Sequence, residues 1–286
     1  MTGCKEMTIH FPIKFDKMSG TGNDFIIIDH REMFIPLSEQ AEFAKKVCRR
    51  MFSVGADGLI LLESSDVADF RWRFYNSDGS IAEMCGNGAR CTARFAYEKG
   101  MASKSMRFET VAGIIEAKIL GEGEEVSILM TEPFDYRRNQ ALNLDGIERQ
   151  VHFVNTGVPH AVIFLDNEEA PVKIWGRKVR FHELFQPQGA NANFVTVCGE
   201  NELKVRTYER GVEDETMACG TGCVASAIMA VLEKGMSSPI RVRTSGGDKL
   251  EIFFDLTEDG GAVQKVYMQG ATRVIYSGQL TAESLL

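Results

Sequence analysis

The sequence predicts an α/β (α+β) fold with two pseudo-symmetric halves, each a curved, mostly antiparallel sheet around a central helix. A Cys-Gly-x-Gly motif followed by a helical stretch occurs twice, at Cys85 and at Cys219, and the two cysteines lie 134 positions apart. Both helical stretches close with a Glu-Lys-Gly-Met tetrad, at 98–101 and at 233–236, and the tetrads lie 135 positions apart. Spacing this constant indicates a duplicated fold, and we expect the functional site in the cleft between its halves.

Shorter similarities recur along the whole chain at nearly the same offset. The matched segments are Gly22 with Gly157, 55–57 with 189–191, 70–75 with 203–208, and Thr110 and Gly113 with Thr244 and Gly247. A drift this small over the full length predicts two domains of like fold. We place the first at residues 1–140, carrying Cys85, with the last strand at about 270–286 as a candidate addition to it, and the second at residues 141–286, carrying Cys219.

Each half presents the same order of elements, which follows from local residue patterns. Runs rich in β-branched and aromatic residues, and runs in which apolar and polar residues alternate, are typical of strands. In the first half they lie at 25–29, 59–63, 70–75, 106–109 and 114–120, and in the second at 161–165, 194–198, 203–208, 240–243 and 249–255. A helix is expected at 38–51 in the first half, with Ser38 as its N-cap. The cysteine loop and its helix follow the alternating strand in both halves.

The second cysteine helix is apolar on nearly every side from Cys223 to Leu232. A helix that is apolar all round is a buried one, and this helix is too short to span a membrane. Gly100 and Gly235 occupy positions typical of the glycine that ends a helix. We therefore expect each half to enclose its cysteine helix within a curved sheet.

The composition is that of a globular protein and bounds the class of partner. The chain has 286 residues, of which 44% are hydrophobic and 25% charged, a balance typical of soluble domains. No apolar run is long enough to cross a bilayer, and residues 1–10 lack the apolar core of a signal peptide. We therefore expect a cytoplasmic protein without a membrane partner. The net charge of −8 argues against a nucleic-acid partner, because such proteins usually carry a basic face.

Seven cysteines are present, and an odd number in a cytosolic chain argues against a disulfide framework. Most buried cysteines act as small apolar side chains. This is the interpretation for Cys48, Cys91, Cys198 and Cys223, whereas Cys4 lies in an end that we expect to be mobile.

A zinc site made of Cys85, Cys91, Cys219 and Cys223 is the metal alternative. Structural zinc prefers closely spaced cysteine pairs. Cys219 and Cys223 meet that spacing, whereas Cys85 and Cys91 are too far apart for one loop, so we expect no metal.

The positions of Cys85 and Cys219 favour catalysis by thiols. At the start of a helix the first N–H groups are unpaired and the helix dipole is positive, which stabilises a thiolate. The glycines that follow expose N–H donors that can bind a carboxylate, and Asn87 and Thr221 add a side-chain donor in each loop. Two sulfurs approaching one Cα from opposite faces could remove and return a proton, one as thiolate and one as thiol. This chemistry needs neither pyridoxal phosphate nor a metal.

Several motifs together make the sequence resemble the diaminopimelate epimerases, which are cofactor-independent amino-acid epimerases with two cysteines. The motifs are Ser19–Phe25, Gly55–Gly58, Tyr75–Ser80, Cys85–Cys91, Thr156–His160, Tyr208–Gly211 and Cys219–Gly222. The resemblance covers about residues 15–278. It implies two pseudo-symmetric α/β halves and interconversion of LL- and meso-diaminopimelate, a step toward lysine and bacterial cell wall. It also implies a homodimer with its C-terminal strand near the interface, a place that suits Tyr276.

The same resemblance assigns the site residues. Cys85 and Cys219 would be the acid/base pair, with His160 and Glu209 beside the thiols to tune them. The residues that would hold the substrate are Asn23, Asn76, Asn191, Glu209 and Arg210, and those that would cradle its α-carboxylate are Gly86, Asn87, Gly220 and Thr221. Without the resemblance, His160 is a candidate structural histidine, and Glu209 with Arg210 a candidate surface pair.

The chain departs from the family pattern at two positions. Many members have asparagine where this chain has Val158 and glutamine where it has Gly58. Substrate contacts at these points would then come from the backbone, from water, or from neighbours such as Asn155 and Asp57.

Two alternatives remain open from the sequence. One keeps the chemistry but changes the substrate, to another amino acid or a hydroxyproline. The other is a thiol redox or binding protein in which Cys85 and Cys219 form a switchable disulfide.

Overall fold

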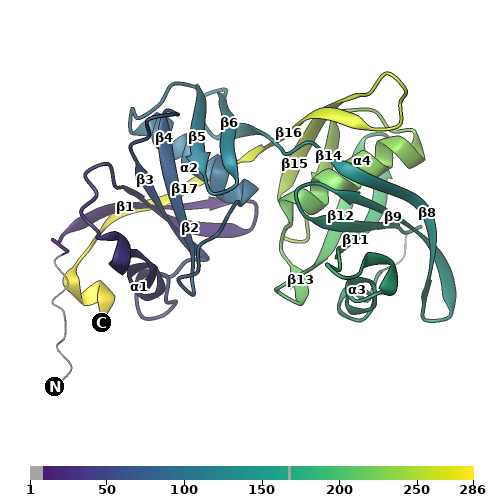
Figure 1. The fold of residues 1–286 in the computed structure, drawn as a ribbon, viewed down its shortest axis with the longest axis horizontal. Helices are drawn as coiled ribbons and strands as arrows, with labels where there is room; N and C mark the ends of the chain where they lie inside the picture. Colours follow the sequence, from purple (N-terminus) through teal and green to yellow (C-terminus); the bar gives the residue numbers. More distant parts are fainter. Residues whose placement is uncertain (1–8, 167–168) are drawn as a thin grey trace. The chain divides into compact units, whose positions relative to one another are not determined.

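The computed structural model describes residues 9–166 and 169–286, so Cys4 and its predicted mobile end lie outside the described residues. The chain forms two compact units (Figure 1). The first contains the chain up to Val126 together with Thr272–Leu286, and the second is Ser127–Ala271. The predicted boundary near residue 140 falls inside a strand of the second unit, because that strand pairs with the one that follows it.

The first unit surrounds one helix with a mixed sheet. Its strands are β1 (Ile13–Gly20), β2 (Asn23–Asp29), β3 (Gly58–Glu63), β4 (Phe70–Asn76), β5 (Ser105–Thr110), β6 (Gly113–Leu120) and β17 (Arg273–Leu280); its helices are α1 (Leu37–Val47), α2 (Gly86–Glu98) and the short η2 (Ala282–Leu285). The strands pair in the order β17-β1-β2-β3-β4-β5-β6. Only β2–β3 and β4–β5 among these pairs are parallel. A further strand, β7 (Glu125–Leu129), crosses the division between the units.

The second unit repeats this plan. Its strands are β8 (Phe134–Leu144), β9 (Ile147–Asn155), β10 (Pro159–Phe164), β11 (Asn191–Gly199), β12 (Glu202–Glu209), β13 (Asp214–Thr216), β14 (Ile240–Arg243), β15 (Lys249–Leu256) and β16 (Val263–Ala271); its helices are α3 (Val172–Arg180), η1 (Glu183–Phe185) and α4 (Gly220–Lys234). The order β8-β9-β10-β11-β12-β14-β15 matches the first unit strand for strand, and the parallel pairs, β10–β11 and β12–β14, fall at equivalent places.

The match between the two units also explains why the C-terminal strand, β17, belongs to the first unit. In the second unit β8 lies beside β9, and the equivalent neighbour of β1 in the first unit is β17, from the far end of the chain. The predicted duplication is therefore confirmed, although the two copies do not follow each other as unbroken segments of sequence.

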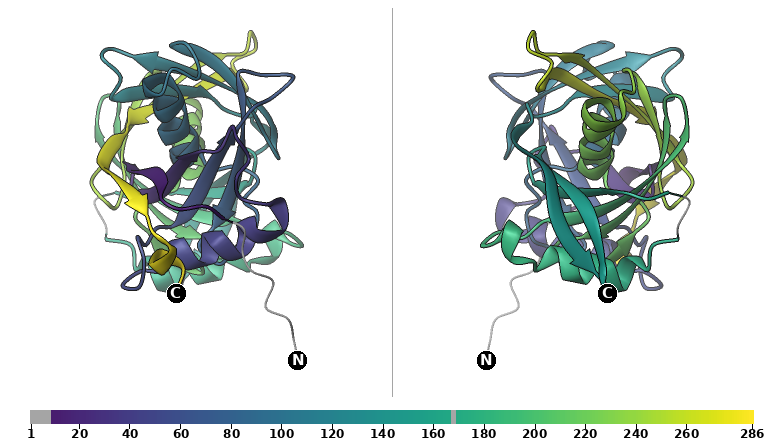
Figure 2. Two further views of the ribbon diagram at one scale, coloured as in Figure 1. Left: turned by 90° about the vertical axis from the view of Figure 1, so that its left-hand side faces the viewer. Right: turned by 90° about the vertical axis from the view of Figure 1, so that its right-hand side faces the viewer.

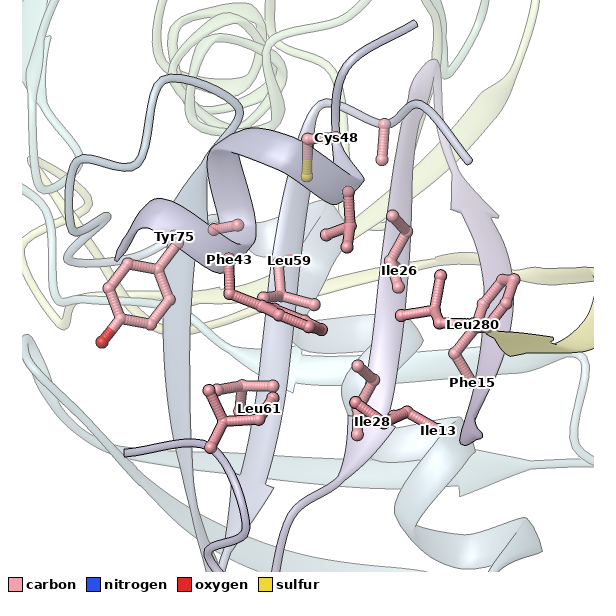
Figure 3. Packing of buried hydrophobic residues seen from close by; sticks show 14 of the residues in the cluster. Ile13, Phe15, Ile26, Ile28, Phe43, Cys48, Leu59, Leu61, Tyr75 and Leu280 are labelled. Atoms are coloured by element: carbon pink, nitrogen blue, oxygen red, sulfur yellow. The ribbon is translucent and has the colours of Figure 1, made fainter. Parts of the chain in front are cut away.

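Helices cover both faces of the central strands, which accounts for their apolar sequences. Every residue of β3 is buried, as expected for a strand packed on both sides. Phe43 of α1 packs against Ile26 and Leu59 on one face (Figure 3). On the other face Ile60 lies against the first turn of α2. Each cysteine helix packs against a curved sheet. Figure 2 shows α2 in its left view and α4 in its right view with strands on more than one side.

The prediction of a buried second cysteine helix is confirmed, since Gly222 to Ala230 are all buried. Gly235 is the C-cap of α4 and has the left-handed conformation, with φ of 66°, whereas Gly100 follows Lys99, the C-cap of α2, with φ of 65°. Among the residues that the structure describes, no helix has the length and apolarity needed to cross a membrane.

Two local predictions are wrong, and one helix was not predicted. The N-cap of α1 is Pro36, and Ser38 lies inside the first turn without capping it. Helix α3 is the counterpart of α1 in the second unit, although no helix was expected there. Cys198 is exposed, because it stands at the end of β11 where the chain turns, whereas Cys48, Cys91 and Cys223 are buried as expected.

Candidate active site

Cys85 and Cys219 are the N-cap residues of α2 and α4, as predicted. Both have extended backbone, and the carbonyl of each accepts the first helical hydrogen bond, from Ala89 at 2.8 Å and from Cys223 at 2.9 Å. Each thiol therefore stands at the positive end of a helix dipole. Cys85 is half-buried and Cys219 is 8% exposed.

The thiol of Cys219 is held in its protonated form. Burial is the largest cause that raises its pKa, and the negative charge of Glu209 raises it further. The hydroxyl of Thr221, 3.5 Å from the sulfur, and the N–H of Gly222 lower the pKa, but they do not offset the first two causes. These opposing groups make the ionisation of Cys219 sensitive to whatever binds beside it.

Glu209 stands at the end of β12, half-buried and close to Cys219. Burial raises its pKa, and the nearby side chain of Thr216 only partly counters that shift. A carboxyl group in this environment can exchange a proton more easily near neutral pH than an exposed glutamate. The charge of Glu209 thus acts on the thiol of Cys219, and the catalytic role that the resemblance implies for Glu209 stays a prediction.

His160 is fully buried at the start of β10. Its Nδ1 lies 3.1 Å from the amide nitrogen of Asn193, whose oxygen accepts a hydrogen bond from the hydroxyl of Thr207 at 2.9 Å. Burial, followed by the positive charge of Arg210, lowers the pKa of His160 to about 3. Neither Asn193 nor Thr207 belongs to the residues predicted from the sequence. The available signal for Thr207 was a polar residue that continues the alternating face of Leu203 and Val205, and for Asn193 a polar residue between Ala192 and Phe194.

Asn191 and Arg210 are joined directly. The amide of Asn191 donates to the carbonyl of Pro159 at 3.0 Å, and its oxygen accepts from the backbone N–H of Arg210 at 2.8 Å. The guanidinium of Arg210 donates to the carbonyl of Gln188 at 3.2 Å. Asn191 therefore fixes the turn in which Arg210 stands. The second unit brings together Cys219, Thr221, His160, Glu209, Asn191 and Arg210.

In the first unit Asn87 connects the start of α2 to the turn before β2. Its amide nitrogen donates to the side chain of Asn23 at 2.8 Å and to the carbonyl of Thr21 at 3.1 Å, and its oxygen accepts from Arg90 at 2.8 Å. The amide hydrogens of Asn87 are therefore engaged within the protein, in contrast to the ligand donor expected from the sequence, and the backbone N–H groups are the donors that this loop could offer to an anion.

Asn23 and Asn76 are both near Asp57. Asn23 donates to the Asp57 carboxylate at 2.9 Å, while the Asp57 carbonyl accepts from Ser77 at 3.0 Å. Asn76 is half-buried at the end of β4, and its amide donates to the hydroxyl of Ser80 at 3.0 Å. The first unit therefore gathers Asn23, Asn76 and Asn87 around one group of turns.

Gly58 occupies a position with no room for a side chain. A Cβ added there would lie 2.5 Å from the ring of Phe74 and 2.7 Å from the carbonyl oxygen of Tyr75. The carboxylate of Asp57, suggested as a substitute contact, is already bonded to Arg50 and Asn23. Asn155, the other suggested neighbour, accepts the N–H of Gly157.

The described residues contain no group of three or more His, Cys, Asp or Glu side chains placed to hold a metal ion. Cys91, one of the four ligands of the zinc alternative, is completely buried, and burial raises the pKa of its thiol to about 12.

Comparisons with known proteins agree with this architecture. Over most of its length the chain superposes on a phenazine biosynthesis protein of the PhzF family from Bacillus anthracis (TM-score 0.72, 15% identity, 95% of this chain and 100% of that one). It also superposes on a hydroxyproline epimerase from Agrobacterium vitis (TM-score 0.66, 14% identity, 95% and 93%). The two-unit fold is thus shared with known racemases and epimerases.

The sequence comparison is more specific. The model of the diaminopimelate epimerase family matches residues 15–134 and 152–275. The diaminopimelate epimerase of Aquifex aeolicus is 45% identical over 284 residues, covering 96% of this chain and 99% of that protein, and that of Archaeoglobus fulgidus is 41% identical, covering 96% and 98%. The chain belongs to the diaminopimelate epimerase family, and it is an isomerase that acts as an amino-acid epimerase.

Proposed function

We propose that this enzyme interconverts LL- and meso-diaminopimelate by moving the α-proton between the thiols of Cys85 and Cys219. The observation that carries the proposal is the paired placement of these cysteines. Each is the N-cap of a helix that begins Gly-x-Gly, at equivalent positions of a duplicated unit. A reaction that inverts one carbon needs a proton acceptor on one face and a proton donor on the other.

The helix starts supply the electrostatic part of the reaction. The backbone N–H groups of Gly86–Asn87 and Gly220–Thr221 would bind the α-carboxylate, since unpaired helix N–H groups attract anions. As the proton leaves Cα, negative charge grows on that carboxylate, and the same donors stabilise it. The protein's backbone therefore supports a carbanion-like transition state without pyridoxal phosphate.

The proton transfer itself exchanges the states of the two sulfurs. One thiolate takes the α-proton and becomes a thiol, while the opposite thiol gives its proton to the other face of Cα and becomes a thiolate. The reverse reaction uses the same groups in exchanged roles. Without ligand, Cys219 keeps its proton at neutral pH because burial and Glu209 raise its pKa, and this is the form that donates.

The remaining predicted residues are proposed to hold the substrate. Diaminopimelate carries an amino and a carboxylate group at each end, so its far end needs a cation and hydrogen-bond acceptors. Arg210 is suited to the far carboxylate, because a guanidinium can form two parallel hydrogen bonds with it. The other substrate-binding residues are proposed to be Asn23, Asn76, Asn191 and Glu209, while Glu209 and His160 also tune the thiols.

The chemistry also constrains where the enzyme works and how it assembles. Two free thiols persist in a reducing compartment, so we infer that the enzyme acts in the cytoplasm, in lysine and cell-wall precursor synthesis. The homodimer stays a prediction. Ile275 and Tyr276 on β17 are 53% and 45% exposed and would meet a second copy.

The deciding experiment is incubation of the reduced enzyme with LL-diaminopimelate in deuterated water, followed by mass and chirality of the product. We expect one deuterium at Cα together with the meso form. Cys85→Ala and Cys219→Ala should each lose epimerisation, whereas Cys198→Ala, at the exposed cysteine, should keep it. Exchange with another amino acid but not with diaminopimelate would reassign the substrate. No exchange with any amino acid under reducing conditions would favour the thiol redox alternative.

A further inference from the structure

A buried polar network lies under the first turn of α4. Asn193 of β11 and Thr207 of β12 are directly paired across the sheet, and they are 0% and 3% exposed. A Cβ placed on Gly222 would lie 2.3 Å from the Asn193 oxygen, 3.3 Å from the Thr207 hydroxyl and 3.3 Å from the Cys219 sulfur. The network therefore touches the same turn of helix that carries the thiol.

The hydrogen bonds of this network determine where the proton of His160 sits. The amide nitrogen of Asn193 donates to the carbonyl of Ala161 at 2.9 Å, and its oxygen accepts from Thr207 at 2.9 Å, so the orientation of the amide is fixed at both ends. The same nitrogen lies 3.1 Å from Nδ1 of His160. An amide N–H group only donates, so Nδ1 must be the accepting nitrogen and the imidazole proton lies on Nε2.

That Nε2 is buried and has no hydrogen-bond partner within the described part of the chain. Buried donors in native proteins are nearly always satisfied, and an exception calls for an explanation such as a ligand. The charge of Arg210 acts on the same ring. A neutral N–H donor beside a cation suits an anionic oxygen, such as a substrate carboxylate.

The equivalent place in the first unit shows that the fold does not require these polar groups. The repeat matches His160 with Phe25, and the matching strands place Ile60 and Phe74 opposite each other where Asn193 and Thr207 stand. The rings of Phe25 and Phe74 meet edge to face, with their centroids 5.8 Å apart, and Gly88 of α2 packs on Ile60 and Phe25. One cysteine helix thus rests on an apolar trio and the other on a hydrogen-bonded one.

We propose that Asn193 and Thr207 hold His160 as the neutral tautomer protonated on Nε2, so that His160 acts as a hydrogen-bond donor to an anionic oxygen of the substrate. The inference rests on the proposed epimerase function for its ligand, but the tautomer is a property of the free protein. Asn193 and Thr207 are then positioning residues, acting through His160.

The first test is nitrogen-15 NMR of the reduced protein labelled on histidine, with the His160 signals assigned by their loss in His160→Gln. We expect Nδ1 unprotonated and Nε2 protonated, unchanged between about pH 5 and 8, the range in which an ordinary histidine titrates. His30 is an internal control in the same spectrum. Its Nε2 accepts from Ile35 and its Nδ1 faces Glu63, so it should show the opposite tautomer. A proton on Nδ1 of His160, or an imidazolium in this range, would overturn the proposal.

Variants test the function of the tautomer. Asn193→Asp replaces the donor to Nδ1 with an acceptor, so we expect the proton of His160 to move to Nδ1 and kcat to fall at least tenfold. Thr207→Val removes the hydroxyl that fixes the Asn193 amide, so we expect a smaller population of the Nε2-protonated tautomer of His160. Thr207→Ser keeps a hydroxyl and should retain the wild-type tautomer. Ile60→Val, at the matching apolar position, controls for packing and should leave the NMR signals of His160 and kcat nearly unchanged. Inactivity of the wild type on diaminopimelate would contradict its assignment as the substrate, while the NMR result would still decide the tautomer of His160. A shifted tautomer with unchanged kcat would refute the role given to His160.

Discussion

The sulfur of Cys219 lies 3.5 Å from the hydroxyl oxygen of Thr221, two residues along the same helix start. The hydroxyl lowers the pKa of the thiol, while burial and the charge of Glu209 raise it. One small side chain therefore favours the thiolate that the proposed reaction needs, and one carboxylate opposes it. These opposing effects can be separated by substitution.

Thr221→Val should slow the reaction by roughly ten- to a hundredfold. A hydrogen bond to a charged group contributes about 1.5–3 kcal/mol, and about 1.4 kcal/mol corresponds to a factor of ten in rate. Because the hydroxyl lowers the Cys219 pKa, its loss should move the rise of alkylation by iodoacetamide to higher pH. Thr221→Ser is the matched control, since it keeps the hydroxyl and should stay close to the wild type. Equal alkylation profiles for the valine and serine variants would contradict a role for the hydroxyl.

Glu209→Gln should change two properties of Cys219 in opposite directions. Removing the charge removes a cause that raises the pKa of the thiol, so alkylation of Cys219 at neutral pH should become several-fold faster. Epimerisation should nevertheless fall by on the order of 10²-fold, because Glu209 is proposed both to hold the substrate and to tune the thiols that transfer the proton. Mass spectrometry of the alkylated peptide and the deuterium assay measure the two effects separately. If both rates fell together, the charge of Glu209 would not be acting on the thiol.

The same variant should also change how stability depends on pH. Burial raises the pKa of Glu209 above its value in the unfolded chain, so the folded state holds the proton more tightly. The protonated Glu209 contributes fully to the free energy of unfolding below the pKa that it has in the unfolded chain. This contribution is lost as the pH rises through the pKa that it has in the folded protein. Glutamine carries no charge at any pH, so the Glu209→Gln variant does not lose this contribution. Its midpoint of urea unfolding should exceed the wild-type midpoint at neutral pH, and the two midpoints should converge in acid. Equal midpoints at neutral pH would exclude a buried charge.

Sequence patterns predicted those helices and strands that are determined by residues close together along the chain. The Cys-Gly-x-Gly motifs located both helix starts, and the continuous apolar run of β3 located a strand covered on both faces. The place of β17 was harder to assign, because the pairing of β1 with a strand from the other end of the chain depends on contacts between distant residues. Within the site, an asparagine in a motif does not reveal its partners. Asn87 turned out to bond inside the protein, and the contribution of Asn193 depends on the strand beside it.

The internal role of Asn87 predicts a sensitivity to charge. Asn87→Asp would place an acceptor opposite the Asn23 oxygen and the Thr21 carbonyl, where the amide now donates. Leaving buried acceptors unpaired costs about 1–3 kcal/mol, so the midpoint of chemical unfolding should fall accordingly. Asn143→Asp is the control, because Asn143 is exposed and its oxygen accepts the Gly146 N–H, a bond that an aspartate oxygen can keep. Equal stability of the two variants would contradict this account of Asn87.

Gly222 and Gly88 are equivalent positions in the two cysteine helices, yet they should respond differently to the same substitution. A methyl group on Gly222 would lie 2.3 Å from the Asn193 oxygen, whereas on Gly88 its nearest neighbour would be a methyl carbon of Ile60 at 3.4 Å. Overpacking of a core typically costs about 1–3 kcal/mol, while alanine is favoured over glycine inside a helix by about 1 kcal/mol. Gly222→Ala should therefore lower the melting temperature and displace Asn193, and Gly88→Ala should hold or raise it. Thermal unfolding of the two variants, with the NMR signals of His160 as a second readout, decides the matter. If both alanines were tolerated equally, the close packing of Asn193 under α4 would be wrong.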